Sequence, residues 1–147
     1  PQVHAIFVNL YFGQGGPFTR QAREKGVTLP FFGIENFEDE NEVKTSTGAM
    51  VNSWYIQADD GNSQFLTAYR SRFPGKSLFF AANCHDIMLL AADAVKRGLT
   101  SEQFNSFLHT VKNFNGALGT FSATGDNRFS IGAVVKRVTP EGFVRQE

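Results

Sequence analysis

Three closely spaced glycines follow an apolar run near the start of the chain, where a phosphate-binding turn could form. Gly13, Gly15 and Gly16 precede a polar stretch, so they lie between a predicted strand and a predicted helix. A dinucleotide fingerprint, G-x-G-x-x-G, requires another glycine three residues after the second one, and this chain has Phe18 there. The fingerprint therefore fails. We expect instead a tight turn that brings a helix N-terminus close to a small ligand, a geometry that suits a carboxylate.

An acid and a phenol come directly after two apolar runs, where an open sheet binds ligands. Glu35 follows the sequence PFFGI, and Tyr11 follows residues 3–10. Ligands of open α/β sheets lie beyond the carboxyl ends of the strands. A carboxylate there can accept charge-assisted hydrogen bonds from an ammonium group, and a tyrosine offers a hydroxyl or a ring face. Spacing alone leaves open that Glu35 is a solvated loop acid and that Tyr11 is a half-buried core residue.

The other candidates for chemistry are few. His4, His85 and His109 lack the spacing of metal ligands, so we expect no metal site. The sequence Cys84-His85-Asp86 could suggest a nucleophile, but adjacent residues at a helix start point in different directions, and catalytic partners usually meet through the fold. No G-x-S-x-G, H-E-x-x-H or P-loop motif occurs. An enzyme is therefore the weaker class, and we expect no cofactor.

Composition and charge exclude several kinds of partner. The 147 residues suffice for one ordinary domain, and 41% of them are hydrophobic. Lysine plus arginine equals aspartate plus glutamate, at 14 each, so we expect no nucleic-acid partner. The single cysteine excludes an internal disulfide, and no apolar run approaches the ~20 residues of a membrane span. Among the aromatic residues, Trp54, Tyr55, Phe79 and Phe80 could line an apolar pocket, although such residues more often form core.

Hydrophobic patterns predict the elements that would position these residues. Residues 3–10, 17–25 and 29–37 predict a strand, a helix and a second strand, a βαβ unit typical of a parallel sheet. The sequence MVNSWYIQ predicts a third strand after a short acidic helix, and ADDGNS is the strongest linker signal. Near the end, residues 131–138 predict a strand, and TPEG predicts the turn of a hairpin.

The middle of the chain predicts helices without a sheet. Helical spacing of apolar residues predicts helices over residues 63–73 and about 85–97, and Thr100 with Gln103 has the spacing of a capping box. The apolar face expected for the second helix consists of Ile87, Leu90, Ala91, Ala94 and Val95. We find no convincing strands in this segment. Its helices therefore need a sheet that this chain barely provides, which indicates a piece of a larger fold.

Four segments in order resemble one known family. They are AIFVNLYFGQGGPFTRQAREKGVTLPFFGIENF, FLTAYRSRFPG, AANCHDIMLLAADAVKRG and GTFSATGDNRFSIGAVVKRVTPEGFV. Together they resemble the C-terminal part of the type I periplasmic solute-binding proteins of ABC importers, in the branch that includes branched-chain amino-acid and amide receptors. The resemblance covers nearly the whole chain. It implies an α/β fold, a parallel sheet with flanking helices, that is incomplete because the N-terminal part of both lobes is missing.

The resemblance also implies a division into lobes and a set of ligand contacts. Residues 1–58 would belong to lobe 2, residues 59–128 to the helix-rich part of lobe 1, and residues 129–147 would return to lobe 2. Tyr11 and Glu35 fall on positions that meet the ligand in amino-acid-binding members, with Glu35 facing the ammonium group. Phe79 or Phe80 would lie near the ligand side chain from the opposite lobe. Family members commonly have Gly-Tyr-Asp where this chain has Cys84-His85-Asp86, which puts the role of that tyrosine in doubt.

The expected function is therefore non-catalytic. The intact periplasmic or extracytoplasmic protein would capture a small amino acid or amide and pass it to an ABC permease. Two alternatives are a cytoplasmic ligand-sensing regulator with the same two lobes and, less favoured, a flavodoxin-like enzyme. The chain begins with Pro1 rather than methionine, so we expect a processed or truncated product without any targeting segment. Because its sheets would be incomplete, we also expect the isolated chain to self-associate.

Overall fold

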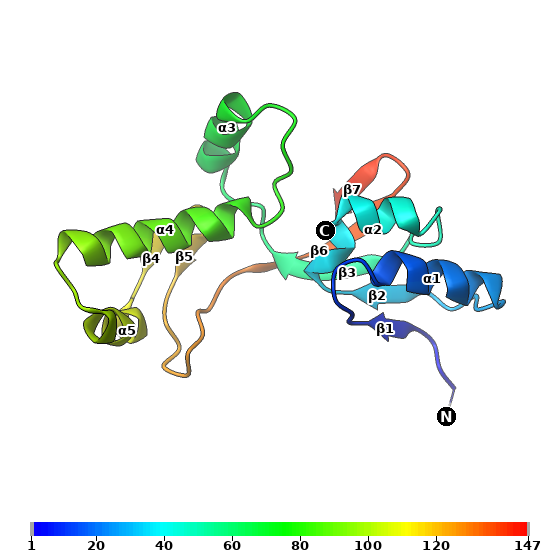
Figure 1. Ribbon diagram of the computed structural model, residues 1–147, viewed down its shortest axis with the longest axis horizontal. Coiled ribbons are helices and arrows are strands. Elements are labelled where there is room, and N and C mark those ends of the chain that lie inside the picture. Colours follow the sequence, from blue (N-terminus) through cyan, green and yellow to red (C-terminus); the bar gives the residue numbers. More distant parts are fainter. Residues whose placement is uncertain (1, 147) are drawn as a thin grey trace. The chain divides into compact units, whose positions relative to one another are not determined.

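The computed structural model describes residues 2–146, which divide into two compact units. Within the described residues, unit 1 comprises residues 2–57 and 133–146, and unit 2 comprises Ala58–Gly132. Figure 1 shows the elements in chain order. Across residues 2–146, every helix is too short or too polar to cross a membrane.

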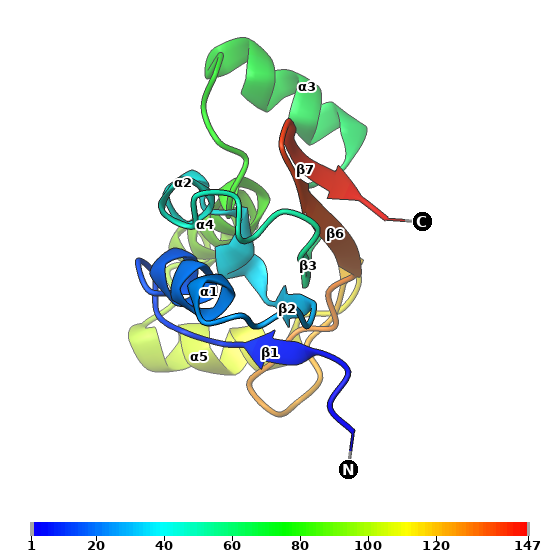
Figure 2. The same cartoon turned by 90° about the vertical axis from the view of Figure 1, so that its right-hand side faces the viewer.

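Unit 1 is a five-stranded sheet with two helices on one side. Its elements are β1 (Ile6–Val8), α1 (Gly15–Glu24), β2 (Phe31–Gly33), the 3₁₀ helix η1 (Glu35–Glu38), α2 (Glu40–Thr45), β3 (Trp54–Ala58), β6 (Ala133–Thr139) and β7 (Gly142–Arg145). The strand order is β1-β2-β3-β6-β7. β1, β2 and β3 are parallel, whereas β6 and β7 form an antiparallel hairpin, so the sheet is mixed rather than purely parallel. Both views place α1 and α2 on the same side of it (Figures 1 and 2).

The core of unit 1 lies between this sheet and its helices. The residues that form it are Val8, Phe31, Phe37, Met50, Tyr55 and Val138. The predicted strand-helix-strand order is confirmed, although the strands are shorter than the apolar runs. Gly26, which follows the last turn of α1, has a φ of +84°, so the backbone there takes the left-handed conformation that favours glycine.

The other face of the sheet carries a row of aromatic side chains. The register pairs Phe7 with Phe32 and Phe32 with Trp54, so the three rings lie side by side on neighbouring strands. Their centroids are 5.0 Å apart for the first pair and 4.7 Å for the second. Phe7 is 52% exposed and Trp54 is 40% exposed. This face of the sheet is therefore apolar and open to solvent.

Unit 2 consists of three helices and a short hairpin. Its elements are α3 (Ser63–Arg72), α4 (Ala81–Lys96), α5 (Ser101–Thr110), β4 (Phe114–Gly116) and β5 (Gly119–Phe121). The predicted helices are confirmed, and so is the capping box of Thr100 and Gln103 at the start of α5. The expectation of no strands here was wrong, because β4 and β5 pair as an antiparallel hairpin. Strands of three residues are too short to produce a recognisable alternation in the sequence.

Helix α4 is buried on one side only. The buried positions recur every four residues, at Ala82, Asp86, Leu90 and Ala94. Of the predicted apolar face, Ile87 is 63% exposed and Val95 is 79% exposed, so that prediction was wrong for these two residues. These two residues are exposed because few surfaces within unit 2 pack against α4. Leu90 packs in a small cluster with α5 and the hairpin, and unit 2 has no larger sheet to cover the rest of α4.

Candidate ligand-binding site

Two adjacent parallel strands bring Tyr11 and Glu35 to the same edge of the sheet. β1 and β2 are in register with Val8 opposite Gly33. Tyr11 follows Val8 by three residues, and Glu35 follows Gly33 by two, so both lie beyond the carboxyl ends of their strands. Tyr11 is 84% exposed, and Glu35 is half-buried as the first residue of η1. Both side chains come from unit 1, at the edge where open α/β sheets bind ligands.

The glycine-rich corner binds a carboxylate, but the carboxylate belongs to the protein. Glu42, in α2, is 2% exposed and accepts hydrogen bonds from the backbone N–H groups of Gly13 and Gly16. The Gly16 contact is 2.6 Å long. The N–H groups of Gly13 and Gly16 at the start of α1 are therefore occupied by a protein carboxylate, where the sequence analysis expected the carboxylate of a small ligand. The sequence therefore correctly predicted that a carboxylate binds at this helix N-terminus, but it did not show that the carboxylate is that of Glu42.

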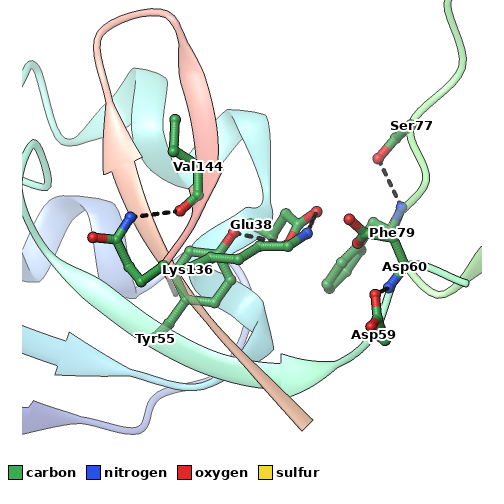
Figure 3. A network of polar contacts seen from close by, with 9 residues as sticks. Glu38, Tyr55, Asp59, Asp60, Ser77, Phe79, Lys136 and Val144 are labelled. Atoms are coloured by element: carbon green, nitrogen blue, oxygen red, sulfur yellow. Dashed lines mark hydrogen bonds and ion pairs between the residues drawn. The ribbon is translucent and has the colours of Figure 1, made fainter. Parts of the chain in front are cut away.

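Unit 1 also contains a buried ion pair that the sequence analysis did not predict. Lys136 Nζ lies 3.0 and 2.9 Å from the two carboxylate oxygens of Glu38, and Tyr55 donates a 2.8 Å hydrogen bond to Glu38 (Figure 3). Lys136 is 4% exposed and Glu38 is 7% exposed. The available signal was the strand VVKRV, whose alternation places Lys136 on the same side as the buried Val134 and Val138.

Phe79 and Phe80 belong to unit 2 and precede α4. Their ring centroids are 4.3 Å apart. The backbone N–H of Phe79 donates to Ser77 Oγ over 3.1 Å (Figure 3). Phe79 is half-buried. Phe80 is 41% exposed and has a φ of +55°, a left-handed conformation that is uncommon for a residue with a side chain. This pair is therefore held in a defined turn at the N-terminus of α4.

The sequence Cys84-His85-Asp86 has a structural use in unit 2. The carboxylate of Asp86 accepts hydrogen bonds from the backbone N–H groups of Ala117 and Leu118, at 2.7 and 2.9 Å. It thereby fixes the turn of the β4–β5 hairpin to α4. The expectation that these neighbouring side chains diverge was wrong for one pair, because His85 Nδ1 lies 3.0 Å from Asp86 Oδ1. Cys84 is a free, exposed thiol.

Helices α3 and α4 enclose an apolar groove within unit 2. Its lining includes Phe65, Tyr69, Phe73, Cys84 and Met88. None of the predicted site residues lines this groove. Over residues 2–146, the structure also contains no group of three or more His, Cys, Asp or Glu side chains that could hold a metal ion. The lining also includes Asn62, Gln64, Arg72 and His85, although most of its exposed area is apolar.

An α/β unit with polar side chains beyond adjacent parallel strands has the architecture of a ligand-binding lobe. The chain belongs to the periplasmic binding protein family, whose sequence profile matches residues 1–142. This finding confirms the family resemblance. It also confirms the non-catalytic class, because the family and its solved relatives are solute-binding proteins. No curated protein matches the chain.

Solved structures of this fold are similar over nearly the whole chain. One is the leucine binding protein LivK from Thermotoga maritima, with a TM-score of 0.82 and 21% identity over 98% of this chain and 44% of that one. Another is the branched-chain amino acid transporter substrate binding protein LivJ from Streptococcus pneumoniae in complex with isoleucine, with a TM-score of 0.76 and 26% identity over 99% of this chain and 46% of that one. The type I periplasmic binding protein fold is therefore confirmed. The chain spans less than half the length of either relative.

Proposed function

We propose that this chain is the C-terminal segment of an extracytoplasmic receptor that captures a small amino acid or a related amide for an ABC importer. The observation that carries the proposal is the placement of Tyr11 and Glu35 beyond two adjacent parallel strands. The relatives support the class of ligand, because one is named a leucine binding protein and another was solved with isoleucine. Family membership supports a location outside the cytoplasm.

Each unit would contribute to a different lobe of the receptor. Unit 1 would belong to lobe 2 and unit 2 to lobe 1, close to the division at residues 58 and 129 expected from the sequence, with the remainder of both lobes supplied by the rest of the intact protein. Glu35 would accept hydrogen bonds from the ligand ammonium group, and Tyr11 would offer its hydroxyl or ring. Phe79 or Phe80 would contact the ligand side chain from lobe 1. Closure of the lobes would trap the ligand before it reaches the permease.

We expect Glu35→Gln to weaken binding of L-leucine by about 10-fold to 100-fold, because a neutral amide cannot form charge-assisted hydrogen bonds with the ammonium group. Calorimetric titration of the full-length protein that contains this chain measures the effect. Glu40→Gln is the matched control, since Glu40 is exposed at the start of α2 and should leave the affinity unchanged. Equal affinities for Glu35→Gln and the unsubstituted protein would remove Glu35 from the site.

The isolated chain is also proposed to self-associate through its uncovered apolar surfaces. These are the aromatic row of Phe7, Phe32 and Trp54 in unit 1 and the outer side of α4 in unit 2. Large exposed apolar patches are typical of interfaces. We expect sedimentation velocity to show species larger than the 16.3 kDa monomer, increasing with protein concentration. A compact monomer at every concentration would contradict this proposal.

A further inference from the structure

The segments that carry Tyr11 and Glu35 are joined by a side chain. Asn36 Nδ2 donates a hydrogen bond to the backbone carbonyl of Leu10. Asn36 directly follows Glu35, and Leu10 directly precedes Tyr11. One hydrogen bond therefore connects the immediate neighbours of the two proposed ligand-binding residues, across 26 positions of sequence.

A second connection fixes the other end of the Tyr11 segment. Glu42 accepts hydrogen bonds from the N–H groups of Gly13 and Gly16, where α1 begins. Its two oxygens thus lie at the N-terminal end of that helix, where the backbone N–H groups point outward. Glu42 is itself held in place because its backbone N–H donates a 3.2 Å hydrogen bond to Asp39, the N-cap of α2. The loop from Leu10 to Gly16 is thus anchored at both ends to the η1–α2 segment.

We propose that Asn36 and Glu42 are positioning residues, which hold Tyr11 and Glu35 in a fixed relation at the rim of the site. This inference rests on the proposed function. Tyr11 is 84% exposed, so packing of its own side chain does little to fix it, and its position depends on its backbone. A loop held in its binding geometry loses less conformational entropy when the ligand arrives. The two anchors supply that preorganisation from a single neighbouring segment.

Glu42 also restricts what the corner can bind. Because its carboxylate already uses the N–H groups of Gly13 and Gly16, these donors are not available to a carboxylate of the ligand. The corner therefore affects ligand binding by fixing the position of the Tyr11 loop, and these two N–H groups do not contact the ligand. A carboxylate of the ligand must therefore bind to other hydrogen-bond donors of the intact receptor.

Hydrogen exchange of the full-length protein tests the anchors independently of any ligand. Glu42→Gln keeps the side-chain shape but turns an NH₂ group toward one of the two N–H donors. We expect exchange in residues 10–17 to become about tenfold faster or more, with Glu40→Gln unchanged. Asn36→Asp places a carboxylate against the Leu10 carbonyl, and Asn41→Asp is its exposed isosteric control. Unchanged exchange in both Glu42→Gln and Asn36→Asp would overturn the inference.

Binding of L-leucine then separates positioning from general stability. We expect Asn36→Asp and Glu42→Gln each to weaken affinity by about fivefold or more. In a background that carries both Tyr11→Ala and Glu35→Gln, the same changes should weaken affinity less than about twofold, because both contacts that they position are already lost. Faster exchange combined with unchanged leucine affinity, or full additivity with that double substitution, would overturn the positioning role. If Glu35→Gln itself leaves affinity unchanged, Glu35 is not in the site and its positioning by the anchors is overturned; if the unsubstituted protein binds no amino acid, the proposed function fails, and the exchange experiment alone decides whether the anchors exist.

Discussion

Replacing Lys136 with methionine should lower the free energy of unfolding of unit 1 by about 3–5 kcal/mol. Methionine fills a similar volume, but it leaves the Glu38 carboxylate buried without its cation. The remaining 2.8 Å hydrogen bond from Tyr55 cannot replace an ammonium group that lies within 3.0 Å of both carboxylate oxygens. The cost comes mainly from the unpaired charge, since taking a single ion out of water is far more unfavourable than burying a paired one.

Urea unfolding followed by Trp54 fluorescence measures this change, because Trp54 is the single tryptophan of the chain and lies in unit 1. Protein concentration must be constant, since association adds to apparent stability. Arg137→Met is the control, because Arg137 is the exposed neighbour on β6 and should change stability by no more than about 0.5 kcal/mol. Combining Lys136→Met with Glu38→Gln removes both charges and should restore part of the loss. A loss below about 1 kcal/mol in Lys136→Met would show that the pair behaves like an exposed one.

The fold was predictable wherever its signals are local. Strand-length apolar runs, the glycine after α1 and the capping box of Thr100 and Gln103 each involve residues within a few positions of one another, and the structure confirms the elements that they predict. The exposure of Ile87 and Val95 was not predictable in this way. A helical stripe shows which residues could be buried, whereas burial itself depends on which surface packs against the helix.

In the candidate site, too, the features set by sequence neighbours were predicted, and the contacts between residues far apart in the sequence were missed. Tyr11 and Glu35 come directly after apolar runs, so their place at a strand end follows from sequence neighbours. The anchors do not follow from sequence neighbours, because Glu42 accepts hydrogen bonds from Gly16 and Gly13, which lie 26 and 29 positions away in the sequence. The Lys136–Glu38 pair spans 98 positions. Such contacts depend on how helices and strands pack, which local patterns do not encode.

Gly16→Ala should destabilise unit 1 by about 3 kcal/mol or more, whereas the same change at the adjacent Gly15 should not. A Cβ on Gly16 would approach the Glu42 carbonyl oxygen and Thr45 Oγ1 more closely than side-chain carbons approach such atoms. Relieving that overlap must move α1 away from α2, at a cost of about 1–3 kcal/mol for overpacking. It also loosens the hydrogen bonds to the Glu42 carboxylate, each contributing about 1.5–3 kcal/mol. The gain in helix propensity from alanine, at most about 1 kcal/mol, is too small to compensate.

The control is the neighbouring glycine of the same helix turn. A Cβ on Gly15 would lie 3.5 Å from Glu42 Oε2, an ordinary van der Waals contact, so Gly15→Ala should be neutral or stabilise by up to about 1 kcal/mol. Urea unfolding of both variants, followed by Trp54 fluorescence, compares them directly. Gly16→Ala should also accelerate hydrogen exchange in residues 10–17, because the shift of α1 separates its N-terminus from Glu42. Equal stabilities for the two variants would mean that α1 and α2 do not approach each other closely at Gly16, and that the glycine pair serves the turn alone.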